Sequence, residues 1–198
     1  LQKHIENVGK FGLPCVVAVN RFATDSQEEI DVVLAEARAA GAFDAVVSEV
    51  HGKGGDGGRA LADAVMRAAN SPRRSFRFLY QLDQSIPEKI ETIAKEVYGA
   101  DGVAYEKAAL AAIENYTHLG YDRLPICMAK TQYSFSHDPA LRGRPTGFTL
   151  PVRDVRLSGG AEFLYPLTGT IQTMPAFGRH PSAMDMDIDE HGRIRGMF

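Results

Sequence analysis

The sequence predicts an α/β fold, in which a parallel-sheet layer built from βαβ units is followed by a smaller, loop-rich α+β C-terminal region. Two observations lead to this prediction. Residues 13–70 alternate apolar runs of strand length with segments of helical periodicity, which is typical of βαβ units. Seven of the ten prolines lie at or after Pro125, among short apolar runs, and this favours loops and short strands over further βαβ units.

The first part of the chain is expected to hold two strands and two helices. The strands are the apolar runs at residues 14–19 and 45–50. Ser26, followed three residues later by Glu29, is typical of a helix capping box. The apolar stripes of the two helices are Ile30, Val33, Leu34 and Ala37, and then Leu61, Ala64, Val65 and Ala68. Both stripes are expected to pack on a parallel sheet, which brings the ends of consecutive strands to one edge.

The second part is expected to hold two more helices and several short strands. One helix opens at residues 85–88 and carries the apolar stripe Ile86, Ile90, Ile93 and Val97. The other carries an apolar stripe from Tyr105 to Tyr116 and ends before Gly120. Residues 76–82 fit a short strand or a loop equally well. Short strands are also expected at residues 125–129, 147–150 and 164–171.

Composition and charge exclude several classes of protein. The net charge of −3, without a basic half, argues against a nucleic-acid footprint. The longest apolar run, from Leu13 to Val19, is far shorter than the roughly 20 residues that cross a bilayer, and no signal pattern precedes it. These features favour a cytoplasmic protein that contacts no membrane. The two cysteines, Cys15 and Cys127, are expected to be buried reduced thiols.

The most conspicuous motif is the glycine-rich segment at residues 52–58. Its glycines at 52, 54 and 57 match the GxGxxG spacing, and Gly52, Gly54 and Gly55 are candidates for a loop beside a ligand. A dinucleotide-binding α/β module built on this segment is the alternative function. It lacks the acidic residue expected about 20 positions further on. A simple turn between strand and helix stays equally open.

A second candidate segment follows the first strand, where open α/β sheets place their ligands. Asn20 can donate to and accept from a heterocycle, Phe22 offers a stacking face, and Asp25 can accept from ring nitrogens. The alternative is that residues 24–26 cap the next helix and that Phe22 belongs to the core.

Other patterns favour structural roles. The acidic run at residues 185–190 lacks the Gly and Glu of a calcium loop and fits an edge strand better. The histidines lack partners at metal-ligand spacing, so no metal site is expected. Arg153 and Arg156, with Lys130, fit either a polyanion site or ion pairs at an interface, and the second interpretation is favoured.

With these residues laid out, the chain resembles the formate–tetrahydrofolate ligase family from Leu1 to Phe198. The likeness lies in residues 3–7, 16–22 with Thr24 and Asp25, 41–45, 124–131, 145–148, 164–167 and 173–175. The resemblance implies a reaction of ATP, formate and tetrahydrofolate that proceeds through formyl phosphate to 10-formyltetrahydrofolate, ADP and phosphate. It also implies ATP, magnesium and a monovalent cation as cofactors, and a homotetramer as the assembly.

The resemblance further implies that the chain is a C-terminal fragment. Residues 1–72 are expected to be the end of a phosphate-loop-type α/β domain that binds nucleotide and folate, and residues 73–198 a C-terminal α+β region. The catalytic residues are expected upstream of Leu1, because no GxxxxGK[ST] phosphate loop is present. The chain alone is therefore expected to be inactive.

The same resemblance implies a folate-binding wall made of Phe22, Val47 and His51. The family places an aromatic pair around the pterin ring. Phe22 matches one member of the pair, and His51 stands where the family usually has Trp. Phe22 and His51 are expected to face each other across a gap that admits a flat bicyclic ring.

Overall fold

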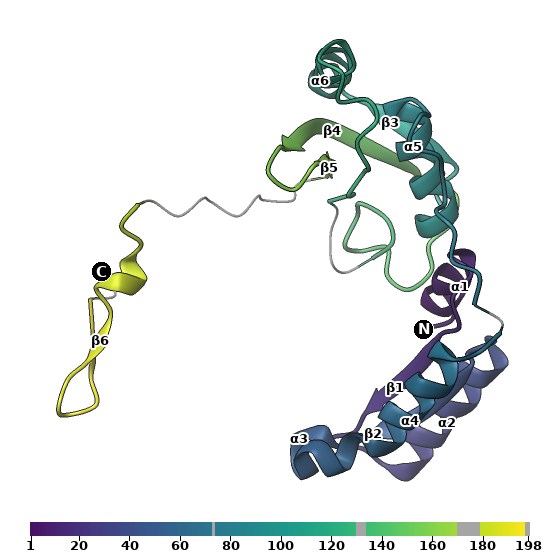
Figure 1. Ribbon diagram of the computed structural model, residues 1–198, viewed down its shortest axis with the longest axis vertical. Helices are drawn as coiled ribbons and strands as arrows, with labels where there is room; N and C mark the ends of the chain where they lie inside the picture. The colour runs from purple at the N-terminus through teal and green to yellow at the C-terminus, as the bar shows by residue number, and fades with distance from the viewer. Residues whose placement is uncertain (73, 130–133, 170–178, 197–198) are drawn as a thin grey trace.

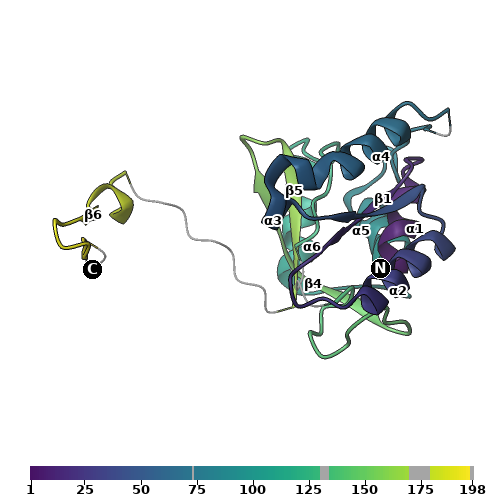
Figure 2. The same ribbon diagram turned by 90° about the horizontal axis from the view of Figure 1, so that it is seen from below.

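The computed structural model describes residues 1–72, 74–129, 134–169 and 179–196, and it is a mixed α/β structure (Figure 1). The first elements are α1 (Gln2–Lys10), β1 (Val16–Asn20), α2 (Gln27–Ala39), β2 (Asp44–Ser48), α3 (Val50–Lys53), the 3₁₀-helix η1 (Gly54–Gly58) and α4 (Arg59–Ala69). They are followed by α5 (Ile86–Ile93), the π-helix η2 (Ala94–Tyr98), β3 (Gly102–Tyr105), α6 (Lys107–His118), β4 (Thr149–Ser158), β5 (Phe163–Thr168), the 3₁₀-helix η3 (Ser182–Met184), β6 (Asp187–Ile188) and β7 (Ile194–Arg195). The hairpin β6–β7 lies apart from the rest of the chain (Figures 1 and 2).

The first unit, which spans residues 2–69, contains the predicted βαβ arrangement. Strands β1 and β2 are parallel, with Asn20 opposite Ser48 at their carboxyl ends. Helices α2 and α4 both contact this pair of strands. The predicted capping box is confirmed, because the Ser26 side chain accepts a hydrogen bond from Glu29 N and the Glu29 side chain accepts one from Ser26 N.

The second unit, which spans residues 86–168, is a three-stranded sheet in the order β3-β4-β5. Strand β3 is parallel to β4, and β4 is antiparallel to β5. Helices α5 and α6 pack on this sheet. The core they share consists of Ile86, Ile90, Ala109, Ile113, Ile126, Val152, Val155 and Leu164. The predicted stripes of both helices therefore supply part of the core.

The expected helix from Tyr105 is wrong at its start. Tyr105 ends strand β3, and α6 begins at Lys107. Strand β3 has only four residues, and its hydrogen-bonding partner β4 lies far along the chain, so no local pattern indicates it. The chain therefore makes a second parallel crossover, β3–α6–β4, where the sequence predicts none.

Other expectations for the second half have mixed outcomes. Residues 76–82 form a loop, and the predicted strand at 125–129 forms single bridges to β5 at Ile126 and Ala129. Cys15 is half-buried, whereas Cys127 is exposed, which corrects the expectation of a buried thiol. The predicted edge strand in the acidic run is β6. No helix among the described residues is long and apolar enough to cross a membrane.

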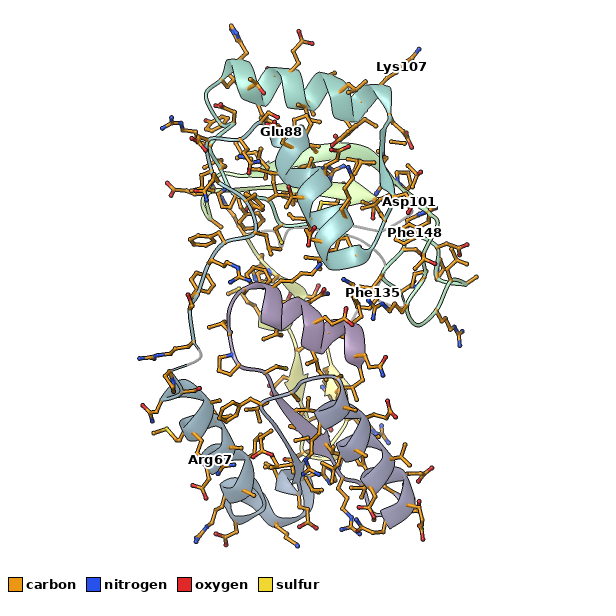
Figure 3. All side chains as sticks on the ribbon, turned by 90° about the vertical axis from the view of Figure 1, so that its right-hand side faces the viewer. Arg67, Glu88, Asp101, Lys107, Phe135 and Phe148 are labelled. Carbon is orange, nitrogen blue, oxygen red and sulfur yellow. The ribbon has the colours of Figure 1, made fainter. Side chains whose placement is uncertain are left out.

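Helix α1 joins the two units. Its residues at positions 3, 7 and 10 lie on one helix face, and Figure 3 shows α1 between the two units. Lys3 Nζ and Lys10 Nζ donate to Glu96 O at 2.8 and 2.6 Å, and Asn7 Nδ2 donates to Val97 O at 3.0 Å. These carbonyls lie near the C-terminal end of η2, where the helix dipole favours cations.

Two further contacts hold the same joint. Glu6 accepts two hydrogen bonds from the Arg144 guanidinium, at 2.7 and 2.8 Å, and this contact lowers the pKa of Glu6. On the opposite face of α1, Ile5 is buried against Ala37 and Ala45. The helix thus presents an apolar face to the first unit and a polar face to the second.

Lys89 of α5 is fully buried. Its Nζ donates to the backbone carbonyls of Leu124 at 2.9 Å, Leu82 at 3.4 Å and Asp122. Burial lowers the pKa of Lys89, while the nearby carboxylate of Asp122 raises it. The Lys89 ammonium group therefore links the segment before α5 and the segment after α6 to helix α5.

The turn between β4 and β5 contains a strained residue. Glu162 has φ +56°, a conformation that glycine adopts without the Cβ clash of other residues. We expect Glu162→Gly to raise the free energy of unfolding by about 1 kcal/mol. Urea denaturation measures this change. Ala161→Gly is the matched control, because Ala161 has no positive φ, and it is expected to lower stability. An unchanged or less stable Glu162→Gly protein would contradict the assignment of strain.

Lys89→Met tests the role of the buried ammonium. We expect this variant to lose about 2 kcal/mol or more of stability, because three carbonyls lose their donor in a buried position. Lys95→Met is the control, since Lys95 is exposed and pairs with Glu91 at 3.5 Å on the surface. Thermal unfolding of both variants checks the difference, and equal midpoints would show that Lys89 is dispensable.

Candidate functional site

The carboxyl edge of strands β1 and β2 brings together the two segments that the sequence singles out. Asn20 and Ser48 lie opposite each other, and Arg21 N donates to Ser48 O at 3.0 Å. The segment after Asn20 and the glycine-rich segment after Ser48 therefore start at the same edge, as predicted. Asn20 is exposed there.

The segment after β1 is held by hydrogen bonds between Phe22 and Asp25. Asp25 Oδ2 accepts from Phe22 N at 2.7 Å, and Asp25 N donates to Phe22 O at 3.1 Å. One Asp25 oxygen is thus already engaged in closing the turn before Ser26 caps α2. Phe22 is 48% exposed, so the alternative that it belongs to the core is wrong. The turn leaves the Phe22 ring partly exposed to solvent.

The glycine-rich segment is helical, which corrects the expectations of a simple turn or of a loop beside a ligand. It forms α3 and η1, and Gly52 N donates to Glu49 O at 3.1 Å within this structure. Glu49 N donates to Gly57 O at 3.1 Å, so the end of the segment folds back on its start. A Cβ on Gly57 would lie 2.5 Å from the carbonyl carbon and oxygen of Glu49.

The glycines therefore have separate roles. Gly57 permits a close backbone approach, and Gly54 adopts φ +56°. A Cβ on Gly52 or Gly55 would meet nothing within 4 Å. The GxGxxG match thus arises partly from packing, and the helical backbone disfavours the dinucleotide-binding alternative.

Phe22 and His51 come together at this edge. Their ring centroids lie 5.6 Å apart with planes inclined by 48°, and both residues are exposed. A flat ring between two others needs a spacing of roughly 7 Å, which is twice a contact distance of about 3.5 Å. The expected gap for a bicyclic ring is therefore closed here, and the two rings contact each other. Val47 of β2 is half-buried and lies three residues before the start of α3.

Charged side chains lie in the same two segments as the aromatic pair. Lys53 Nζ lies 2.7 Å from Glu49 Oε2. The hydrogen bond from Lys53, with the positive charges of Lys53 and Arg21, lowers the pKa of Glu49. The sequence does not indicate this pair, because the i,i+4 spacing brings the two side chains together only in the helix α3, which the sequence does not predict. Arg21 was missed as well, and only the pairing of β1 with β2 places it beside Glu49.

The site offers exposed rings, an amide and a charged rim, which are groups that bind and orient a planar polar molecule. No cluster of three or more metal-ligating side chains occurs in the described ranges. A groove of about 570 Å³ lies elsewhere, between α1, α2 and the loop at residues 134–144, and neither Phe22 nor His51 lines it. We therefore assign the candidate site from the rings at the sheet edge.

Other residues singled out from the sequence lie away from this edge. Arg156 Nε contacts Asp154 Oδ2 at 2.9 Å, which agrees with the ion-pair interpretation of that segment. Lys130, Thr131 and residues 173–175 lie outside the described residues.

The chain is a mixed α/β protein with exposed aromatic and polar side chains at the carboxyl edge of parallel strands, which is where open α/β sheets place their ligands. Its sequence matches the family formate–tetrahydrofolate ligase over residues 1–198. The chain belongs to this family. It is 50% identical over 197 residues to C-1-tetrahydrofolate synthase, cytoplasmic, of Schizosaccharomyces pombe, and 49% identical over 198 residues to formate–tetrahydrofolate ligase of Herpetosiphon aurantiacus.

Both matches cover the whole chain but only part of each relative. The chain spans 21% of the Schizosaccharomyces pombe protein and 35% of the Herpetosiphon aurantiacus protein. The family is thus established by the full length of this chain, across both units of the fold.

Two glycine substitutions test the helical form of the segment. Gly57→Ala is expected to lower the free energy of unfolding by at least about 2 kcal/mol, because its Cβ forces α3 and η1 apart. Gly55→Ala is the matched control: it meets open space without a positive φ, so a gain of up to about 1 kcal/mol is expected. Chemical denaturation compares both with the parent chain. Equal effects of the two substitutions would mean that the segment is an open loop.

Proposed function

We propose that this chain is part of an ATP-dependent ligase that joins formate to tetrahydrofolate through formyl phosphate, releasing 10-formyltetrahydrofolate, ADP and phosphate. Membership of the formate–tetrahydrofolate ligase family carries this proposal. The printed names of both relatives, at about half identity, support tetrahydrofolate as the substrate class.

The contribution of this chain is the folate-facing wall. The pteridine ring would stack on Phe22 and His51 above Val47, after the two rings move apart. Three observations support this: both rings are exposed, they sit on short segments at one sheet edge, and Phe22 does not serve the core. Asn20 is exposed at the same edge and would donate to or accept from the polar rim of the pteridine.

The residues of this chain do not fit the phosphate groups of ATP. The glycine-rich segment has its backbone in helical hydrogen bonds, and the sequence contains no GxxxxGK[ST] motif. The described residues hold no cluster suited to magnesium, and we assign no residue to a monovalent cation. We therefore derive no phosphoryl-transfer step from this chain, and we expect it to bind folate without turning over ATP.

We further propose that β1 and β2 belong to a larger parallel sheet of the phosphate-loop type. Two parallel strands rarely form a stable sheet alone, and β1 carries the exposed residues Ala18 and Asn20. Residues 1–72 would then belong to that domain and residues 73–198 to a C-terminal domain. We also propose a homo-oligomer, which the resemblance to the family implies, and a cytoplasmic location, which the printed name of the Schizosaccharomyces pombe relative supports.

Tetrahydrofolate binding to variants of this chain tests the proposal. We expect Phe22→Ala to weaken binding about tenfold, a loss of roughly 1.4 kcal/mol, because one stacking face is removed. His51→Trp is expected to leave binding unchanged or to tighten it several-fold, since an indole offers more area than an imidazole. Titration calorimetry measures both.

Phe78→Ala is the matched control, because Phe78 is 72% exposed and is not part of the sheet edge. Thermal unfolding of each variant separates loss of binding from loss of stability. A destabilised Phe22→Ala protein that binds folate normally, together with a silent His51, would refute the stacking wall.

A further inference from the structure

A groove of about 570 Å³ lies between the start of α1, helix α2 and the loop at residues 134–144. It can hold a two-ring small molecule, since ligand pockets commonly measure roughly 300–1,000 Å³. The groove lies where the two units meet, and such places frequently hold ligands. Phe22 and His51 do not line it, so it is separate from the sheet edge.

The loop from the second unit forms an aromatic wall of the groove. Two buried serines hold this loop: the Ser134 and Ser136 hydroxyls lie 3.2 Å apart, and Asp138 N donates to Ser136 Oγ at 3.1 Å. Phe135, between the two serines, contacts His4 with ring centroids 4.8 Å apart, and Figure 3 shows it next to α1. The backbone behind the Phe135 ring is therefore fixed before a ligand arrives, which lowers the entropy lost on binding.

Helix α2 adds exposed apolar side chains to the groove. Val32 and Val33 line it and are 61% and 36% exposed. Ile30 and Ala37 of the same helix are buried, so the core uses a different face of α2. A flat apolar ring that covers the two valines and stacks on Phe135 removes apolar surface from water. The apolar part of the groove thus favours an aromatic ligand.

Charged side chains of both signs line the groove as well. The Arg144 guanidinium has five N–H donors and gives two hydrogen bonds to Glu6, at 2.7 and 2.8 Å. The Glu36 carboxylate accepts a hydrogen bond from Gln2 Nε2 at 3.1 Å, through Oε2. Within the described ranges, neither side chain makes another hydrogen bond. Arg144 therefore keeps donors, and Glu36 keeps acceptor sites, for a ligand.

The spacing of these two groups suits the two charges of an α-amino acid. Their partners on α1, Gln2 and Glu6, are four residues apart, which is about 6 Å along a helix. An ammonium and a carboxylate on one carbon, each with a charge-assisted hydrogen bond of about 2.8 Å, bridge an acceptor and a donor roughly 6–8 Å apart. The ammonium would bind Glu36 and the carboxylate would bind Arg144.

Lys3 adds a second positive charge near Arg144. It lines the groove and is buried, and its Nζ donates to Glu96 O at 2.8 Å. Burial, followed by the positive charge of Lys10, lowers the pKa of Lys3; the Glu6 carboxylate raises it, and Arg144 lowers it again. The cations at this end repel one another, and a ligand carboxylate beside Arg144 would offset that repulsion.

We propose that this groove binds a free aromatic α-amino acid. The ring of the amino acid lies against Phe135, Val32 and Val33. Its α-carboxylate pairs with Arg144, and its α-ammonium group pairs with Glu36. The proposal is independent of folate binding, because it uses none of the residues of the folate-facing wall.

Fluorescence titration of the full chain with L-tryptophan tests the site. The chain contains no Trp, so the indole of the ligand reports binding without an indole signal from the protein. Tryptophanamide lacks the carboxylate, N-acetyl-tryptophan lacks the ammonium group, and leucine, tested by competition, lacks the aromatic ring. We expect each analogue to bind at least about tenfold more weakly than tryptophan, because each leaves one part of the groove without its partner. The absence of saturable tryptophan binding, or equal affinity for all four ligands, would overturn the proposal.

Two charge variants assign the two ends of the ligand. We expect Arg144→Gln to weaken tryptophan binding about tenfold and to leave tryptophanamide binding unchanged, because the amide has no carboxylate to lose. We expect Glu36→Gln to weaken tryptophan binding and to leave N-acetyl-tryptophan binding unchanged. Arg142→Gln is the matched control, since Arg142 is exposed in the same loop and does not line the groove. A variant that weakens tryptophan and its analogue equally would contradict the assigned charge pair.

Val32→Tyr fills the groove and leaves its charges in place. Val32 is exposed, so the core keeps its packing, and circular dichroism confirms that the variant is folded. We expect this variant to lose tryptophan binding and to keep the tetrahydrofolate binding of the parent chain. Val65→Tyr is the control, because Val65 is 48% exposed on α4 and does not line the groove. Parental tryptophan affinity in Val32→Tyr, or displacement of bound tryptophan by tetrahydrofolate, would overturn the proposal.

Discussion

The structure depends on the polar face of α1, where three side chains reach the carbonyl groups at the end of a neighbouring helix. Lys3, Asn7 and Lys10 bind the carbonyls of Glu96 and Val97, which belong to the second unit. Surface ion pairs contribute little singly. Here, however, Lys3 and Asn7 are buried, and the acceptors are backbone groups that a helix leaves unpaired at its C-terminal end. This contact orients the two sheets relative to each other, and with them the sheet edge that carries Phe22.

At the candidate site, one residue of the glycine-rich segment serves packing, while the neighbouring rings stay exposed. Gly57 allows the end of η1 to touch the backbone of Glu49, and this fold holds His51 beside Phe22. The exposed rings contribute little to the core, so the chain carries apolar surface that folding does not need. Surface of this kind is typical of a binding site. The folate-facing wall that we propose uses this surface, and the helical glycine segment sets its geometry.

Exposed apolar side chains recur at Phe76 and Phe78 and at the C-terminal hairpin of β6 and β7. The hairpin differs from the sheet edge in the secondary structure that holds its exposed residues. Phe22 and His51 lie beside parallel strands, whereas the hairpin has two-residue strands that no described element covers.

The sequence by itself determined the local elements whose signals lie within a few residues. The capping box of Ser26 and Glu29, the stripes of α2, α4 and α5, and the parallel arrangement of β1 and β2 were all predictable, because caps and apolar periodicity are short-range properties. The common edge of Asn20 and the glycine segment followed from the same βαβ geometry. The sequence also brought Phe22 and His51 together as a pair, through the resemblance to the family.

The tertiary structure decided whatever depends on residues distant along the chain. Strand β3 exists because β4 pairs with it, so Tyr105 lies in a strand and not in the helix that local periodicity favours. The glycine segment is helical because Gly57 packs on Glu49, which its spacing does not reveal. Lys89 is buried because the segment before α5 and the segment after α6 both place backbone carbonyls around its ammonium group. The direct contact between Phe22 and His51 could not be predicted from the sequence either. The separation of the two rings depends on how two distant segments pack, and residue types alone do not determine this.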